Sequence, residues 1–260
     1  MATAAVLSLC TTCRNRLWQL RQTLAPNLAH LADAPVPAEL SLVDFGSTDG
    51  MAQWVWSEFG EPIETGRLRF FEVSAPTAWH ASRAKNLAHR LATGSYLFNL
   101  DADNFVEPAD LHVIARAAEA GVACSQFSGQ WVDGSYGRVG MPAALFHRLG
   151  GYDESLLPMS GQDVDVIKRI LTLDLPVRKL RAPARMAVQN TRADKVAELG
   201  VAPADAGPFY EAMRDLNSRM SAFKLRAEGP CRPGLFATYK GRLNGTPVTF
   251  DGVGQLHHGA

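Results

Sequence analysis

The sequence has no excess charge of either sign and no long hydrophobic run, and each absence excludes a class of function. Its 26 Lys and Arg residues balance 26 Asp and Glu residues, so the formal net charge is zero. A neutral chain has no broad basic surface for nucleic acid or for an anionic membrane, so an anionic ligand needs a local cluster of donors. No apolar run reaches the ~18 residues of a membrane span, and no secretory leader is recognisable. We expect a cytoplasmic protein with no membrane span and no nucleic-acid partner.

Cysteine is scarce, with four residues in a chain of 260. Cys10 and Cys13 form a C-x-x-C pair, a spacing typical of redox and zinc sites. A structural zinc site needs a second pair at similar spacing, and Cys124 and Cys231 do not form one. We therefore expect buried or partly buried thiols rather than metal ligands.

Hydrophobic residues make up 47% of the chain and charged residues 20%, as in ordinary globular domains. Short apolar runs alternate with helical patterns over roughly the first 180 residues. The runs predict strands at 4–10, 40–43, 68–73 and 96–100, and the patterns predict helices at 17–31, 54–59, 82–92, 108–120 and 164–173. Pro26 is expected to kink or split the first helix. The alternation favours an α/β fold with a mostly parallel sheet and helices on both faces.

Polar clusters follow three of the predicted strands, at 11–16, 44–49 and 101–104. Ligands of such sheets bind at the carboxyl ends of the strands. Asp101-Ala102-Asp103 places two hard oxygen ligands there, which suit Mg²⁺ or Mn²⁺. Such an ion can bridge a diphosphate and stabilise it as a leaving group. Short acidic turns are also common as caps and surface loops, and the spacing alone leaves both interpretations open.

Two further carboxylates, Asp163 and Asp165, open the predicted helix at 164–173. One of them could cap the helix or be stabilised by its dipole. The other interpretation is a general base that takes a proton from an acceptor hydroxyl. The residues alone do not decide between these roles.

Cationic and aromatic residues gather near the same edge of the predicted sheet. The cations Arg14, Arg16, Arg83 and Lys85 suit contacts to phosphate or a nucleobase. Trp79, Trp131 and Tyr136 lie in or near loops, where an aromatic ring can stack on a sugar or can pack in the core. Surface solvation is the simplest role of each cation by itself.

The motifs fall in the order of a known family. The chain resembles inverting glycosyltransferases of the GT-A fold, on the branch that joins bacterial family-two enzymes to the β-1,4-galactosyltransferases. The resemblance covers about residues 4–195. It rests on six segments: Thr12-Cys13-Arg14-Asn15-Arg16, Val43-Asp44-Phe45-Gly46-Ser47, Ser82-Arg83-Ala84-Lys85-Asn86, Asn99-Leu100-Asp101-Ala102-Asp103-Asn104, Gly150-Gly151-Tyr152-Asp153-Glu154 and Gly161-Gln162-Asp163-Val164-Asp165.

The resemblance implies a fold, a reaction and a role for particular residues. Residues 1–185 would form the GT-A domain that binds a nucleotide-sugar, and 186–260 a small C-terminal lobe or lid near the acceptor site. Asp163 would be the catalytic base, and Asp103 would hold Mn²⁺ or Mg²⁺. The donor, a UDP-sugar, would contact Thr12, Arg14, Arg16, Asp44, Gly46, Ser47, Arg83, Lys85, Asp101 and Ala102. The acceptor, a glycan or a small molecule, would contact Trp131, Tyr136, Met159 and Gln162.

Some positions depart from the family pattern. Gln162 replaces the acidic residue that usually precedes the base, and Phe45 replaces a second Asp. The further metal ligands of the galactosyltransferases correspond by spacing to Met186 and Gln189, so Gln189 would offer a neutral oxygen instead of an imidazole. Met159 stands near the tryptophan that stacks on their acceptor sugar.

Three other functions are compatible with an α/β fold of this length. A dehydrogenase is disfavoured because no G-x-G-x-x-G follows the first predicted strand. A sugar nucleotidyltransferase would place a Gly-rich loop with a basic end there, whereas this chain has Cys10-Thr11-Thr12-Cys13-Arg14. A non-catalytic GT-A-like protein that binds a nucleotide-sugar stays open because of Gln162 and Gln189.

Overall fold

A computed structural model describes residues 6–74, 78–130, 133–232 and 236–258. One sheet of ten strands runs through the molecule in the order β10-β9-β8-β3-β2-β1-β4-β6-β5-β7. The strands are β1 (Leu7–Cys13), β2 (Ala38–Asp44), β3 (Leu68–Val73), β4 (Tyr96–Asn99), β5 (Ala123–Ser125), β6 (Val139–Pro142), β7 (Val177–Lys179), β8 (Tyr239–Leu243), β9 (Thr246–Phe250) and β10 (Leu256–His258).

The centre of the sheet is parallel. Strands β3, β2, β1 and β4 pair in parallel, with Leu9 opposite Leu40 on one side and Phe98 on the other. Leu9 and Phe98 are fully buried, as expected for parallel strands covered on both faces. The remaining strands join mostly antiparallel: β6 beside β4, β5 beside β6, and β8 beside β3. The parallel sheet expected from the alternation is confirmed at its core.

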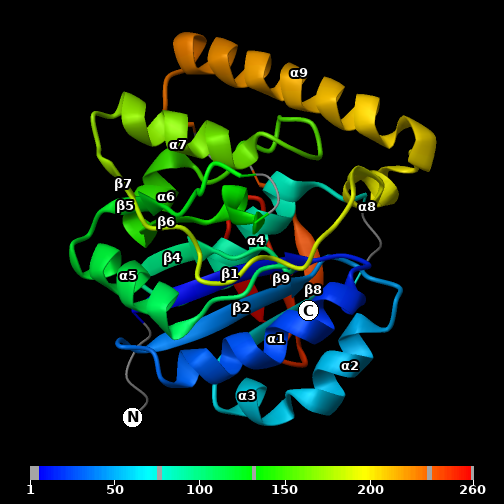
Figure 1. Ribbon diagram of the computed structural model, residues 1–260. Coiled ribbons are helices and arrows are strands. Elements are labelled where there is room, and N and C mark those ends of the chain that lie inside the picture. The colour runs from blue at the N-terminus through cyan, green and yellow to red at the C-terminus, as the bar shows by residue number, and fades with distance from the viewer. Residues whose placement is uncertain (1–5, 75–77, 131–132, 233–235, 259–260) are drawn as a thin grey trace.

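Helices cover both faces of this sheet (Figure 1). One face carries α1 (Leu17–Ala32), α2 (Met51–Glu58), α3 (Gly60–Glu64) and α5 (Pro108–Glu119), and the other carries α4 (Ala81–Leu91), α6 (Ala143–Leu149) and α7 (Gln162–Thr172). Each set has its own apolar core. Leu24 of α1 and Ile114 of α5 belong to the first core, and Leu87 of α4 and Val166 of α7 belong to the second.

Helix α1 is continuous through Pro26, so the proline does not split the helix. Leu24 and Leu28 on either side of the proline are buried in the core and hold the helix against the sheet. Asn27 also ties the helix to the loop after β4, where its amide donates to the Asn104 carbonyl at 2.9 Å and accepts from the Val106 amide at 2.8 Å. These contacts outweigh the loss of one backbone hydrogen bond at the proline.

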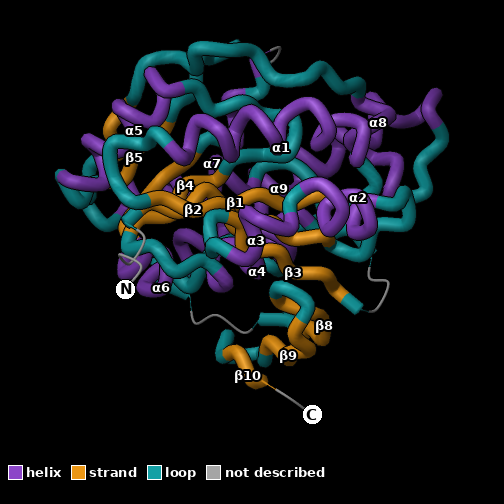
Figure 2. Tube along the Cα trace, turned by 90° about the horizontal axis from the view of Figure 1, so that it is seen from below, coloured by secondary structure: helices purple, strands orange, loops and turns teal. Residues whose placement is uncertain are grey.

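The expected C-terminal extension consists of two parts that lie apart. Helices α8 (Arg192–Val196) and α9 (Ala206–Ala227) pack together through Val196 and Tyr210 beside α7. Strands β8–β10 instead extend the central sheet beyond β3, and Figure 2 shows them at one end of the molecule. Only the helical part therefore lies near the carboxyl ends of the central strands.

Two expectations from composition can be compared with the structure. Cys10, Cys13 and Cys124 are buried, Cys231 is partly buried, and all four are free, which confirms the expected state of the thiols. A search of the described helices found none with both the length and the apolar character needed to cross a membrane.

Candidate active site

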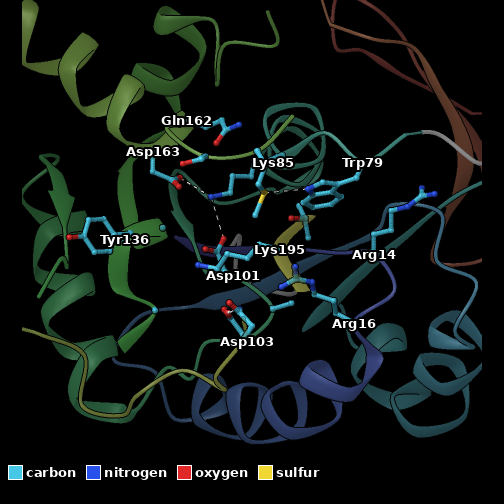
Figure 3. A pocket seen from close by; sticks show the side chains of 18 of the residues that line it. Arg14, Arg16, Trp79, Lys85, Asp101, Asp103, Tyr136, Gln162, Asp163 and Lys195 are labelled. Carbon is cyan, nitrogen blue, oxygen red and sulfur yellow. Dashed lines mark hydrogen bonds and ion pairs between the residues drawn. The ribbon is translucent and has the colours of Figure 1, made fainter. Parts of the chain in front are cut away.

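A cavity of about 280 Å³ opens at the carboxyl ends of β1 and β4. Residues of α1, α4, α7 and the helical part of the C-terminal region line it, and Figure 3 shows many of these side chains. Its lining includes eleven residues expected at the site: Thr12, Arg14, Arg16, Lys85, Asp101, Ala102, Asp103, Tyr136, Met159, Gln162 and Asp163. The fold therefore brings the carboxylates of Asp101 and Asp103 and the candidate base Asp163 into one cavity.

The Asp101–Asp103 turn is fixed by hydrogen bonds from the elements around it. The Leu100 amide donates to the Cys10 carbonyl at 3.0 Å, which extends the pairing of β4 with β1 to the edge of the turn. The Asn104 amide closes the turn on the Asp101 carbonyl at 2.8 Å. Thr23 of α1 donates its hydroxyl to the Ala102 carbonyl at 2.7 Å. The turn thus presents its carboxylates on a rigid support, as precise ligand binding requires.

Lys85 lies between the Asp101 turn and the candidate base (Figure 3). Its ammonium is 2.7 Å from Asp163 Oδ1 and 3.3 Å from Asp101 Oδ1, and its side chain is only 8% exposed. Burial lowers the pKa of Lys85, but the two carboxylates outweigh burial and hold the pKa above its usual value. The lysine is therefore charged throughout the physiological range and joins two of the acidic groups of the cavity, Asp101 and Asp163.

The same lysine acts unequally on the two carboxylates that it joins. Burial raises the pKa of Asp101, but Lys85 and the Asn99 amide outweigh it and keep that pKa below its usual value. Burial also raises the pKa of Asp163, and there Lys85 offsets only part of the shift. Asp163 is thus the better proton acceptor of the pair, which suits a general base.

A nearby cation would stabilise the ionised carboxylate of Asp103. Burial and the adjacent Asp101 charge raise its pKa to about 6. Its two oxygens accept from Asn104 at 2.7 Å and from Asn190 at 2.6 Å. Lys195, which also lines the cavity, is close enough to lower the pKa of both aspartates by its charge. A bound divalent ion would relieve the repulsion between the two carboxylates.

The raised pKa of Asp103 predicts a pH-dependent affinity for Mn²⁺ in the presence of UDP. A metal binds the deprotonated carboxylate, so protons compete below the folded pKa of about 6. We expect the affinity to rise between pH 5 and pH 7, by about tenfold per pH unit below the pKa, and then to level off. Calorimetric titration of Mn²⁺ at fixed UDP, repeated across this range, measures it. An affinity for Mn²⁺ that stays constant from pH 5 to pH 7 would show that the pKa of Asp103 is not raised.

The structure separates the roles of Asp163 and Asp165. Helix α7 begins after Gly161, and no side chain caps it. Asp165 points away from the cavity, where it accepts from Arg169 Nε at 2.9 Å and from the Ser221 hydroxyl at 2.7 Å and is only 1% exposed. Asp163 lines the cavity beside Lys85. Of the two carboxylates, Asp163 is positioned for chemistry and Asp165 for holding α7 against α9.

The expected nucleotide end of the site is built from the loops after β1 and β2. Arg14 donates to the Phe45 carbonyl at 2.8 Å, and Arg16 donates to the Asp194 carbonyl at 2.5 Å. Asp44 is only 3% exposed and accepts from the Ser47 amide at 2.7 Å, while the Ser47 hydroxyl accepts from the Asn15 amide at 3.0 Å. Arg14 and Arg16 line the cavity, whereas Asp44 and Ser47 brace the loop that carries them.

Several residues expected at the site do not line the cavity. Asp44, Gly46, Ser47 and Arg83 are outside its lining, as are Met186 and Gln189. Arg83 points toward solvent, with 42% of its side chain exposed, and pairs with Glu154 at 3.6 Å. Trp131 lies outside the described residues.

The predicted metal ligands Met186 and Gln189 lie outside the cavity lining, whereas Asn190 lines the cavity and contacts Asp103. Met186 is 54% exposed, and the Gln189 amide donates to the Ala187 carbonyl. The Val188 amide donates to the Asp103 carbonyl at 2.8 Å. With the two backbone segments paired in this way, the Asn190 side chain, and not that of Gln189, donates to the Asp103 carboxylate. Among the described residues, no group of three His, Cys, Asp or Glu side chains is arranged to hold a metal. Any ion here must complete its coordination with other ligands.

Sequence reasoning missed residues that the C-terminal region brings to the cavity. They are Asn190, Lys195, Glu198, Tyr210 and Arg214. Glu198 accepts from Arg14 Nε at 2.6 Å and from the Asn15 amide at 2.9 Å, which links this region to the loop after β1. One signal was present in the sequence: Thr191 and Asp194 form a capping box, a helix start that would have placed Lys195 in a first turn.

The wall of the cavity that contains Met159 and Gln162 is partly apolar. Trp79 lines it and lies against Met159, with its indole nitrogen 3.5 Å from the sulfur. Gln162 is buried, and its amide donates to the Leu157 carbonyl at 3.1 Å. Tyr210 and Arg214 of α9 add an aromatic ring and a cation. Apolar surface with a few polar groups is the usual lining of a small-molecule site.

Residues 8–160, more than half of the chain, match the family model described as glycosyl transferase family 2. The chain belongs to this family. The matched segment contains the Asp101–Asp103 turn and Lys85, whereas Asp163 and the α8–α9 region lie beyond its end. No curated protein matches the chain.

Solved structures confirm the GT-A fold of this family 2 chain. TarS 1–349 from S. aureus has a TM-score of 0.52 and 16% identity over 75% of this chain and 63% of that one. The same fragment was also solved with UDP. A β-1,4-galactosyltransferase 7 from Drosophila, in complex with manganese, UDP-Gal and xylobiose, has a TM-score of 0.51 and 11% identity over 73% of each chain. The chain thus spans less than two thirds of the TarS fragment.

Proposed function

We propose that this family 2 chain transfers a sugar from a UDP-sugar to an acceptor hydroxyl, with inversion at the anomeric carbon and with a divalent ion. The observation that carries the proposal is the Lys85 bridge. One buried ammonium joins the carboxylate of the expected donor turn, Asp101, to that of the expected base, Asp163, inside one cavity. The complexes of TarS with UDP and of the Drosophila enzyme with UDP-Gal support the choice of donor.

The reaction follows from the positions of these groups. Asp163 takes the proton from the acceptor hydroxyl as its oxygen forms a bond to the anomeric carbon. The bond from that carbon to the diphosphate breaks on the opposite face, and its electron pair leaves with the diphosphate. The charges of Lys85, Arg16 and Lys195, which all line the cavity, act on the carboxylates of the turn, and they stabilise the charge that develops there. Attack opposite to the leaving group inverts the anomeric centre.

The donor set fits a divalent ion that arrives with a diphosphate. Mg²⁺ is commonly held by one or two carboxylates together with substrate phosphates and water. Asp103, helped by Asp101, supplies those carboxylates, and the raised pKa of Asp103 shows a negative charge that a cation would stabilise. When bound, the ion would supply charge neutralisation to the departing diphosphate.

A thermal-shift screen of nucleotide-sugars with Mn²⁺ or with EDTA tests the proposed donor. A ligand at about a hundred times its Kd stabilises a protein by about 2.7 kcal/mol, which is roughly 5–10 °C for a chain of this size. We expect UDP-sugars with Mn²⁺ to give such a shift and EDTA to remove most of it. Stabilisation by other nucleotides alone would overturn the UDP assignment, and no shift with any nucleotide-sugar would overturn the function.

A further inference from the structure

Helix α9 carries a row of large apolar side chains that the body of the protein does not cover. Phe209, Leu216 and Phe223 are 40%, 50% and 64% exposed. They are seven residues apart, so they return to the same side of the helix after every two turns. The buried residues of the helix, among them Tyr210 and Asn217, lie on another side. Figure 1 shows α9 as the outermost helix, above α7. Exposed rows of this kind mark interaction surfaces.

The exposed charges beside this row are segregated along the helix. Asp205, at the N-cap, and Asp215 lie toward its beginning, and Arg219 and Arg226 lie toward its end. Asp215 accepts from Arg214 at 3.1 Å but stays 64% exposed, so it can still meet a second cation. Asp205 and Asp215 thus lie along the first part of the helix and Arg219 and Arg226 along its last part, whereas Arg214 lines the cavity and Glu228 at the C-cap pairs with Lys224 at 3.6 Å.

We propose that α9 pairs antiparallel with α9 of a second copy of this chain, about a two-fold axis at Leu216. A two-fold interface uses the same patch on both copies. Leu216 then meets Leu216 of the second copy, and Phe209 meets Phe223 of that copy. With a rise of about 1.5 Å per residue, Asp205 comes level with Arg226 of the second copy, and Asp215 with Arg219, to within about 3 Å along the axis.

The charges select this partner and orientation over two others. A parallel pair would place the acidic residues together and the basic residues together, which like-charge repulsion disfavours. A helix that lies on an anionic membrane carries Lys and Arg along its whole polar face. Here Asp205 and Asp215 would meet the lipid headgroups, and the chain has no net positive charge. In the antiparallel pair, the acidic residues of each helix lie against the basic residues of the other.

The pairing has a consequence for the cavity. Tyr210 and Arg214, on the inner side of α9, line it, so a second copy held on the outer side would restrain that wall. The 22-residue helix is about 33 Å long, which gives a small interface compared with the ~800 Å² per partner of standard complexes. We therefore expect a reversible dimer with a micromolar Kd.

Sedimentation velocity of the full chain, from about 1 to 100 μM, tests the proposal around the expected Kd. The mass should rise from 28.2 kDa toward twice that value. Leu216→Glu places two carboxylates at the axis and should leave a monomer at every concentration. Its melting temperature should stay close to that of the wild-type monomer, because Leu216 is half exposed. A wild-type chain that stays monomeric throughout would overturn the proposal.

A charge exchange tests the orientation. Asp215→Arg and Arg219→Asp should each raise the Kd at least about tenfold, and the double variant should restore it. Failure of the double variant to restore dimerisation would overturn the antiparallel register. Co-sedimentation with phosphatidylglycerol vesicles tests whether the apolar row binds a membrane instead of a second copy. Binding that Leu216→Glu abolishes, in a chain that does not dimerise, would assign the row to a membrane instead.

Discussion

Replacing Asp163 by Asn is expected to lower the rate of nucleoside diphosphate release from the donor by about a thousandfold. The amide can still accept the hydrogen bond from Lys85, so the cavity keeps its shape, but it cannot take a proton. Release of the diphosphate is measured at saturating donor, with water or a sugar as the acceptor. Affinity for UDP should change little, because the base does not contact the nucleotide in the proposed mechanism.

The wild-type rate should also depend on pH through the same carboxylate. Burial raises the pKa of Asp163, so its basic form is lost at a higher pH than for an ordinary aspartate. The rate should therefore fall as the pH is lowered, and this acid limb should disappear in Asp163→Asn. A variant with the wild-type rate would show that Asp163 is not the base and would favour a protein that binds a nucleotide-sugar without catalysis.

Replacing Asp165 by Asn should have the opposite effect to Asp163→Asn. We expect a large loss of stability and little loss of activity per folded molecule. Asp165 is buried with Arg169, and Arg232 lies 3.6 Å away. Removing one partner of a buried ion pair costs about 3 kcal/mol because the remaining charge stays buried. For a chain of this size, that corresponds to roughly 6–12 °C in melting temperature.

This variant is the matched control for Asp163→Asn, since both change an aspartate in the first turn of α7. Thermal denaturation followed by circular dichroism measures the stability, and the rate is normalised to the folded fraction. A stable Asp165→Asn chain that has lost its activity would reverse the roles assigned to the two carboxylates.

The fold was predictable where the chain forms long buried elements. The apolar runs at β1 to β4 and the periodic leucines of α1 are strong signals, and the structure confirms these elements. Strands β5, β6 and β7 are three or four residues long and contain polar residues or proline. Segments this short have no periodic pattern of apolar residues from which a strand could be predicted. Strand β8 was expected in a separate lobe because pairing with β3, about 170 residues away, has no local signature.

The candidate site was predictable where a motif follows a strand or opens a helix. Asp101, Asp103, Lys85 and Asp163 all reach the cavity because regular elements fix their direction. The segment after β7 has no such period, and there a difference of one residue decides that Asn190 rather than Gln189 meets Asp103. Helix α9 lies in the C-terminal region, and its sequence does not tell which of its sides faces the cavity.

The cavity is proposed to bind a nucleoside diphosphate and a divalent ion through the Asp101–Asp103 turn. Calorimetric titration of UDP into the wild type and into Asp103→Asn, each with Mn²⁺ and with EDTA, tests it most directly. We predict that Mn²⁺ tightens UDP binding to the wild type by at least about tenfold and has no such effect on the variant. Equal affinities for UDP in all four titrations would contradict the account.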